Sequence, residues 1–197
     1  GLLFLCLWRG RLRLAGLLLI AAGLAQPWLA TAPDIVVDED SKVVAVSDQK
    51  GHLALRPGRG ERFVRAVWGE RYGVSETSWP DPGAESLDLR CDSEGCILHR
   101  KGQKVLIAYT TNALAEDCKD ADAAVSLTAA RAFCSDIKTV DRIDLRRRGA
   151  VALWLTPDGV ITRFVADGLG ERRWVATTQT PHLEGVYRRG NAAEASG

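Results

Sequence analysis

The segment Lys104–Leu127, "KVLIAYTTNALAEDCKDADAAVSL", carries the clearest fold signal in this 197-residue chain. Its first six residues, Lys104–Tyr109, form an apolar run with the composition of a β-strand. "TNALAEDCKDA" then predicts a short helix, for which Asn112 is the expected N-cap. Ala123–Leu127 has strand composition again. A strand, a short helix and a second strand predict a parallel βαβ unit, and therefore an α/β domain.

Further elements are predicted on both sides of this unit. Residues 61–73 predict a helix with Phe63, Val64, Val67 and Trp68 on one face. Residues 139–149 predict a brief strand that runs into one helical turn closed by Gly149. The other strand predictions are residues 34–38, 43–47, 52–56, 87–91, 96–100, 150–155, 160–165 and 172–176. We therefore expect one small mixed-sheet domain over residues 33–176 and a polar, disordered tail over residues 177–197.

The first 32 residues differ sharply in composition from the rest. Residues 14–30 are apolar apart from Gln26, and the basic run "RGRLR" (Arg9–Arg13) precedes them. A run of that length is at the short limit for crossing a bilayer, and the positive-inside rule would place the arginines in the cytoplasm. We expect a transmembrane segment within residues 1–32, the C-terminal piece of a larger membrane protein. The alternative is a secretory signal peptide cleaved after Ala32.

In both alternatives the region after Ala32 is exported. The net charge of this region indicates which classes of partner it can bind. The chain has 26 basic and 25 acidic residues, so removing Arg9, Arg11 and Arg13 leaves 23 against 25. A domain that grips nucleic-acid backbone by itself is usually clearly basic. The expected location is the inner membrane, with the domain on the periplasmic side.

Four cysteines lie in the exported region, namely Cys91, Cys96, Cys118 and Cys134. An even number in an exported domain predicts structural disulfides, although four cysteines allow three pairings. Cys91 and Cys96 flank the turn "DSEG", and Cys118 and Cys134 could meet at one end of the βαβ unit. A zinc site is the alternative, but Cys91, Cys96 and His99 supply only half of one. A redox-active cysteine pair is the third alternative, but the C-x-x-C spacing typical of such pairs is absent.

Catalytic motifs are missing from the sequence. The three histidines are scattered, and there is no H-E-x-x-H, no H-x-H-x-D-H and no G-x-S-x-G segment. We therefore predict no catalytic residue, no metal ligand and no cofactor. The arginines Arg142, Arg146, Arg147 and Arg148 are the candidates for contact with DNA.

Several segments together resemble the C-terminal end of ComEC-type competence proteins, which form the inner-membrane channel for incoming single-stranded DNA. They are "LWRGRLRLAGLLL", "RCDSEGCIL", "ALAEDCKDADAAV" and "TVDRIDLRRRGAVALWL". In much of that family this region is a metallo-β-lactamase-like domain. The present chain resembles a degenerate half of that fold, because Thr110 and Thr111 follow "KVLIAY" where a metal-binding Asp would stand. "TAARAFC" likewise replaces a His-rich turn after "ADAAVSL".

The resemblance implies a non-catalytic accessory domain of a DNA-uptake channel. Its implied partners are the membrane, single-stranded DNA and other competence proteins. Two other functions stay open at this point. One is a metal-dependent nuclease of the metallo-β-lactamase type, and the other is an unrelated secreted or membrane-anchored binding domain.

Overall fold

The computed structural model describes residues 13–29, 31–57, 62–75, 77–130 and 132–170. The chain divides into two compact units, Gly1–Ala32 and Pro33–Gly197. The predicted strand at 172–176, the predicted tail and the apolar residues 2–8 lie outside the described residues.

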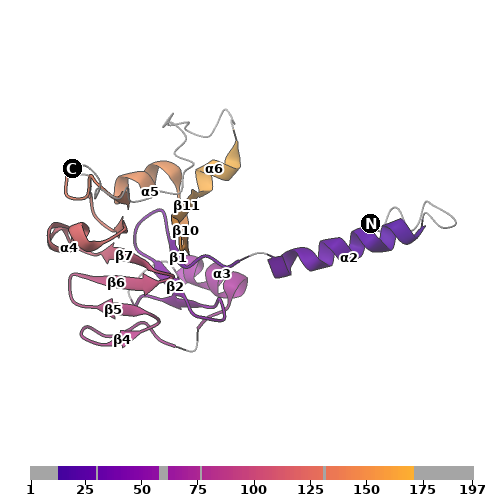
Figure 1. The fold of residues 1–197 in the computed structure, drawn as a ribbon, viewed down its shortest axis with the longest axis horizontal. Coiled ribbons are helices and arrows are strands. Elements are labelled where there is room, and N and C mark those ends of the chain that lie inside the picture. Colours follow the sequence, from indigo (N-terminus) through magenta and orange to yellow (C-terminus); the bar gives the residue numbers. More distant parts are fainter. Residues whose placement is uncertain (1–12, 30, 58–61, 76, 131, 171–197) are drawn as a thin grey trace, which may run out of the picture. The chain divides into compact units, whose positions relative to one another are not determined.

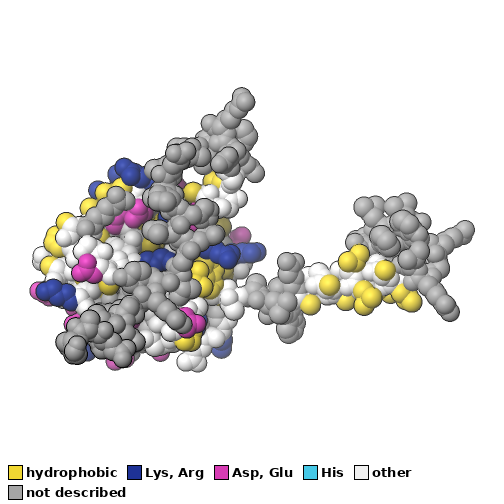
Figure 2. Space-filling model, turned by 45° about the horizontal axis from the view of Figure 1, so that its top comes forward, with side chains coloured by type: hydrophobic (Ala, Val, Ile, Leu, Met, Phe, Trp, Pro, Cys, Tyr) yellow, Lys and Arg dark blue, Asp and Glu magenta, His cyan; other side chains and the backbone are white. Residues whose placement is uncertain are grey.

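The first unit contains the helix α2, Arg13–Leu29. Five of its leucines, Leu14, Leu17, Leu18, Leu19 and Leu24, have exposed fractions of 52–72 %. Figure 2 shows hydrophobic side chains in yellow along this helix. Within the described residues, none of the helices combines the length and apolar character that a membrane crossing needs.

The second unit is a mixed α/β domain whose described strands form two sheets (Figure 1). The first sheet is antiparallel, with the order β11-β10-β1-β2-β3. Its strands are β1 Ile35–Val37, β2 Val44–Ser47, β3 Leu53–Leu55, β10 Val151–Thr156 and β11 Gly159–Phe164. The chain therefore places its first strand in the middle of this sheet, beside a strand from near the end of the described region.

The second sheet is mixed, with the order β4-β5-β6-β7-β8-β9 among the described strands. The pairs up to β6-β7 are antiparallel, whereas β7-β8 and β8-β9 are parallel. Its strands are β4 Glu85–Ser86, β5 Leu89–Cys91, β6 Gly95–Arg100, β7 Gln103–Ala108, β8 Ala123–Ser126 and β9 Lys138–Val140. The parallel β7-β8 pair confirms the βαβ unit predicted from residues 104–127.

The period-two alternation of the strands explains how the sheets pack. Ile35 and Val37 of the first sheet share a buried cluster with Val105 and Ile107 of the second. Because side chains alternate between the faces of a strand, the residues between them, such as Leu106, point to the outer faces. The main core therefore lies between the two sheets, and both outer faces need cover.

Helices and loops cover those outer faces. On the second sheet, α4 (Thr111–Asp117) and the 3₁₀ turn η1 (Cys118–Asp120) bury Ala113, Leu114 and Cys118 against Leu106. On the first sheet, α3 (Arg62–Tyr72) packs over Val36, Ala45 and Leu53. The remaining helices are α5 (Arg142–Arg148), whose Leu145 enters the main core, and α6 (Val165–Leu169).

Two local predictions about the helices are wrong. The residue N-terminal to α4 is Thr110, so Asn112 lies inside the first turn and is not the cap. On α3, Phe63 is 76 % exposed and Val67 43 % exposed. The inward face of α3 instead carries Trp68 and Tyr72, which lie one turn apart against the outer face of the first sheet.

Candidate functional site

The carboxyl ends of the parallel strands β7, β8 and β9 form the edge where α/β proteins usually bind ligands. β7 ends before Tyr109 and Thr110, β8 before Leu127 and Thr128, and β9 before Asp141. Polar side chains follow each of these strand ends.

The first of them is Thr110, where the resemblance would require a metal-binding Asp. Its hydroxyl donates a hydrogen bond to the carboxylate of Glu94, and the backbone N–H of Tyr109 donates to the Glu94 carbonyl at 2.9 Å. Thr110 therefore ties the end of β7 to the β5-β6 turn.

The hydroxyls after β8 are also engaged within the protein. The fully buried Ser126 lies 3.2 Å from the Thr128 hydroxyl, and its own hydroxyl accepts the Thr128 backbone N–H at 3.1 Å. The Thr128 carbonyl in turn accepts the backbone N–H of Arg142 at 3.4 Å. This chain of bonds connects the end of β8 to the first turn of α5.

Asp141 completes the edge as the N-cap of α5. Its carboxylate is fully buried and accepts the backbone N–H groups of Ile143 and Asp144 at 2.9 and 3.0 Å. The same carboxylate accepts the Ala130 N–H at 3.3 Å, so it also fixes the loop that precedes β9. Asp144 closes a capping box by accepting the Asp141 N–H.

Replacing Asp141 with alanine is expected to lower the free energy of unfolding by about 2 kcal/mol, at the upper end for a helix cap. The loss is large because three backbone N–H groups, of which that of Ala130 is buried, lose their acceptor at once. Urea unfolding of the Asp141→Ala protein measures it. Asp144→Ala is the matched control and should cost less, since the Asp141 N–H that Asp144 accepts lies at the longer distance of 3.4 Å. Equal losses for the two variants would contradict this role for Asp141.

Acidic side chains gather near the end of α4. Burial raises the pKa of the Asp117 carboxyl, and the neighbouring charges of Asp92, Glu116 and Asp120 raise it further. Within the described ranges, no three His, Cys, Asp or Glu side chains come together in a way that could hold a metal ion.

The structure pairs the four cysteines as Cys91–Cys96 and Cys118–Cys134, at disulfide distance. The first pair joins opposite positions of β5 and β6, with the two Cα atoms 4.0 Å apart. The second joins η1 to the loop before β9, with the Cα atoms 5.6 Å apart. His99 lies three positions beyond Cys96 in β6, where it pairs with Lys104 of β7.

The Cys91–Cys96 pair adjoins an aromatic contact between the sheets. The Tyr109 hydroxyl lies 2.9 Å from the Sγ atom of Cys96. The guanidinium of Arg56, which follows β3 of the first sheet, lies 3.7 Å from the centre of the Tyr109 ring. Burial raises the pKa of the Tyr109 hydroxyl, against the opposing effect of the Arg56 charge. This stacked pair links the two sheets at the carboxyl end of β7.

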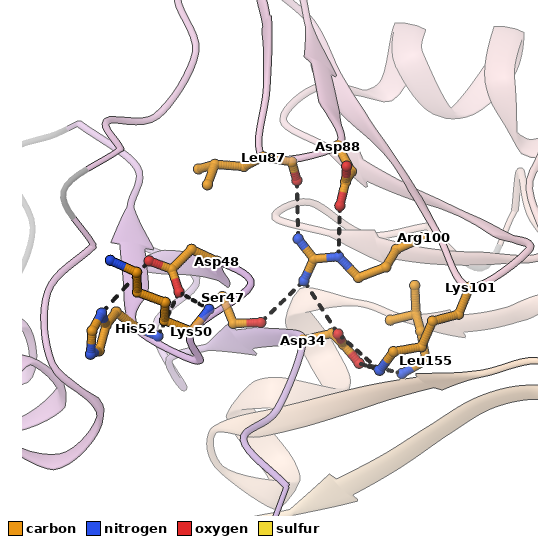
Figure 3. Close-up of polar contacts among 10 residues, drawn as sticks. All are labelled: Asp34, Ser47, Asp48, Lys50, His52, Leu87, Asp88, Arg100, Lys101 and Leu155. Carbon is orange, nitrogen blue, oxygen red and sulfur yellow. Dashed lines mark hydrogen bonds and ion pairs between the residues drawn. The ribbon is translucent and has the colours of Figure 1, made fainter.

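A second link between the sheets lies near the end of β2 and the beginning of β7 (Figure 3). Its centre is Asp34, whose carboxylate is 6 % exposed and accepts the buried Leu155 N–H at 2.8 Å. Arg100 donates to Asp34 at 3.3 Å, and Lys101 donates to it at 3.0 Å. Asp34 thereby connects β1 and β10 of one sheet to the β6-β7 turn of the other.

Arg100 extends this link to two more segments. It donates to the Ser47 hydroxyl of β2, to the Leu87 carbonyl and to the Asp88 carboxylate, each at 3.1 Å. The side chain is only 12 % exposed, so all of its planar donor groups work inside the protein. The Asp34–Arg100 pair therefore holds five segments together, namely β1, β2, β10, the β6-β7 turn and residues 87–88.

Beside this pair, Asp48 contacts Lys50 and His52 within the β2-β3 turn (Figure 3), and it also binds Ser75 after α3. Its carboxylate accepts the Ser75 hydroxyl at 2.8 Å and the backbone N–H groups of Lys50 and His52 at 2.8 and 2.9 Å. Partial burial alone would raise the pKa of Asp48. The hydrogen bonds and the nearby His52 ring outweigh it, so the pKa lies below its ordinary value of 3.8.

This shift predicts a loss of stability in acid. Because the folded pKa of Asp48 is below the unfolded one, the stabilisation is complete above pH 3.8 and disappears as the pH falls through the folded pKa. An Asp48→Asn variant should therefore lose less stability than the wild type on acidification below pH 3.8. Unfolding titrations of both proteins at several pH values test it, and parallel curves would refute it.

Three of the four candidate DNA-contacting arginines lie on the exposed surface of α5. Arg142 and Arg146 are one turn apart on the same face, and Arg147 adjoins them. Figure 2 shows Lys and Arg side chains, in dark blue, on this side of the domain. The last-turn arginines also suit the negative end of the helix dipole.

Arg148 differs from the other three because it packs against the end of β11. Its guanidinium lies 3.8 Å from the centre of the Phe164 ring and donates to Asp167 of α6 at 2.7 Å. The charge of Arg148 also adds to burial in lowering the pKa of Lys138. Arg148 therefore fastens α5 to α6.

The sequence reading missed Asp34, Asp141 and the partner roles of Arg56 and Arg100. A signal existed for Asp34, which directly precedes the apolar strand β1, where burial requires hydrogen-bond partners. Asp141 follows the largely polar strand β9, Lys138–Val140, which carries no such signal. For the two arginines no local signal existed, since their contacts are distant in sequence.

Comparison with protein-family models, with curated proteins and with solved structures finds no match to this chain.

Proposed function

We propose that this chain is the C-terminal part of a ComEC-type DNA-uptake protein of the inner membrane. In this proposal α2 lies in the membrane, and residues 33–176 form a non-catalytic accessory domain on the periplasmic side. The observation that carries it is the pairing of all four domain cysteines in a domain that directly follows an apolar helix. Such disulfides persist in oxidising compartments and are rare in the cytosol.

The surface of α2 supports membrane insertion. Five of its leucines, Leu14, Leu17, Leu18, Leu19 and Leu24, remain exposed, and none of its residues after Arg13 is charged. Water disfavours such a surface, whereas lipid accommodates it.

The carboxyl edge of the second sheet supports an accessory rather than a catalytic role. The strand, strand, helix, strand order on which the metallo-β-lactamase resemblance rests is present as β6, β7, α4 and β8. The residues that follow β7 and β8, however, are hydroxyl side chains used in internal hydrogen bonds, and Asp141 serves as a helix cap. We propose that disulfides and caps stabilise this edge where an enzyme would hold metal.

Contact with single-stranded DNA is assigned to Arg142, Arg146 and Arg147. Three guanidinium groups can neutralise about three phosphates, so the binding is weak and falls steeply as salt increases. The domain as a whole is slightly acidic, which limits it to contact in the presence of the channel.

Two measurements test the membrane arrangement and the uptake function. A periplasmic reporter such as alkaline phosphatase, fused after Gly170, should be active in a bacterial host, and a cytoplasmic reporter at the same position should be inactive. In the transformable host that carries the gene, in-frame deletion of residues 33–170 should reduce the number of transformants. Unchanged transformation by a strain that still produces the membrane part would refute the uptake role.

The intact mass of the purified protein tests the accessory role. Reduction should add about four mass units, two for each disulfide, and elemental analysis should find no zinc. One zinc per chain together with free thiols would favour the metal-dependent nuclease instead.

A further inference from the structure

The outward face of α3 exposes an aromatic and an aliphatic side chain that lie one turn apart. Phe63 is 76 % exposed, and Val67, one turn further on, is 43 % exposed. The opposite face of α3 already packs on the first sheet through Trp68 and Tyr72. Phe63 and Val67 are therefore not needed for the fold, and water disfavours their exposure.

Positive charge surrounds this apolar stripe. Arg62 and Arg71 are exposed at the two ends of α3, and Arg71 follows Val67 at the next turn. The helix carries Arg62, Arg65 and Arg71 against Glu70, a net charge of +2, although the region after Ala32 is slightly acidic. Basic residues beside exposed aromatic and aliphatic side chains are typical of helices that lie in the headgroup region of anionic bilayers.

A series of backbone contacts within the domain links the start of β1 to the end of α3. The Asp34 carbonyl accepts the Ser47 N–H at 2.9 Å. Ser47 pairs with Leu53, whose N–H donates to the Gly73 carbonyl, also at 2.9 Å. Three strand spacings, about 14 Å, therefore separate Asp34 from Gly73, the residue after α3.

We propose that α3 is a membrane-surface contact, in which Phe63 and Val67 enter the interface of an anionic bilayer while Arg62 and Arg71 bind phospholipid headgroups. This inference rests on the proposed insertion of α2. The contact orients the domain on the membrane and leaves α5, on a different part of the domain, for its partner.

Cysteine accessibility in liposomes tests the contact in the whole chain. Phe63→Cys and Val67→Cys are each made in a Cys6→Ser background, with Ala115→Cys as the matched control. Ala115 is exposed on α4, which covers the opposite sheet. A water-soluble maleimide should label positions 63 and 67 about tenfold more slowly than position 115 in liposomes with about 30 % phosphatidylglycerol.

Two further measurements separate the α3 contact from the insertion of α2. In phosphatidylcholine liposomes, or after Arg62→Glu and Arg71→Glu together, labelling at 63 and 67 should rise to the rate at 115. Flotation with the liposomes, resistant to alkaline carbonate, reports insertion of α2 separately, so failure to float refutes the proposed function. A floating protein with fast labelling at 63 and 67 refutes the α3 contact alone. Protection that depends on protein density rather than lipid charge would indicate a second copy of the chain and would also overturn it.

Discussion

Replacing Asp34 with alanine is expected to destabilise the domain by about 3–5 kcal/mol, the usual cost of removing one member of a buried ion pair. Arg100, with 12 % of its side chain exposed, would keep its charge and lose the carboxylate that balances it. The Leu155 N–H, which donates to Asp34 at 2.8 Å, would lose its acceptor as well. Both losses act on the same junction between the sheets.

Urea unfolding followed by tryptophan fluorescence measures this effect. Asp40→Ala is the control, because Asp40 pairs with Lys42 at 3.2 Å on the surface, where 49 % and 55 % of the two side chains are exposed. Such a surface pair contributes about 0–1 kcal/mol. A double variant, Asp34→Leu with Arg100→Met, removes both charges and should recover part of the loss. Similar costs for Asp34→Ala and Asp40→Ala would show that the junction does not hold the sheets together.

Removing the Cys118–Cys134 pair by the double substitution to alanine is expected to cost about 3 kcal/mol. The sequence separation is 16 residues, and closing a loop of that size restricts the unfolded chain by about this amount. Both cysteines are also buried against Leu106 and Leu114 beneath α4, so their loss reduces packing there.

The Cys91–Cys96 pair is the comparison for the removal of Cys118–Cys134. Cys91 and Cys96 are separated by only five positions, so the double alanine variant should lose about 2 kcal/mol. Thermal unfolding of both variants, with and without reductant, gives the ranking. A reductant should destabilise the wild type and leave the quadruple alanine variant unaffected. A wild type indifferent to reductant would argue against both disulfides.

Local sequence patterns were sufficient for most elements of the domain. Residues 104–127 specify their own βαβ unit, because an apolar run, a polar helix and another apolar run leave few alternatives. The hairpin β10-β11 and the helix α5 closed by Gly149 follow for the same reason. In each case the decisive contacts lie within about 25 residues.

The arrangement of the strands in two sheets was not predictable in this way. The sequence reading expected one mixed-sheet domain, whereas the β1-β10 pair joins residues more than 100 positions apart. The same distance hides the Asp34 junction, whose partners stand 66 to 121 positions away. The prediction of the inward face of α3 was wrong for a related reason. The shape of the sheet beneath the helix determines that Trp68 and Tyr72 pack against it, and not Phe63 and Val67.

The central place of β1 has a consequence for biosynthesis. β1 pairs with β2 on one side and with β10 on the other. Its second edge therefore cannot form hydrogen bonds until Val151–Leu153 has been synthesised. The second sheet, by contrast, is built from one continuous stretch, residues 85–140. During translation and export, we therefore expect the second sheet to fold first, while β1–β3 remain incomplete behind it. A chaperone or the membrane itself would have to protect the unpaired edge of β1 until the β10-β11 hairpin has been synthesised.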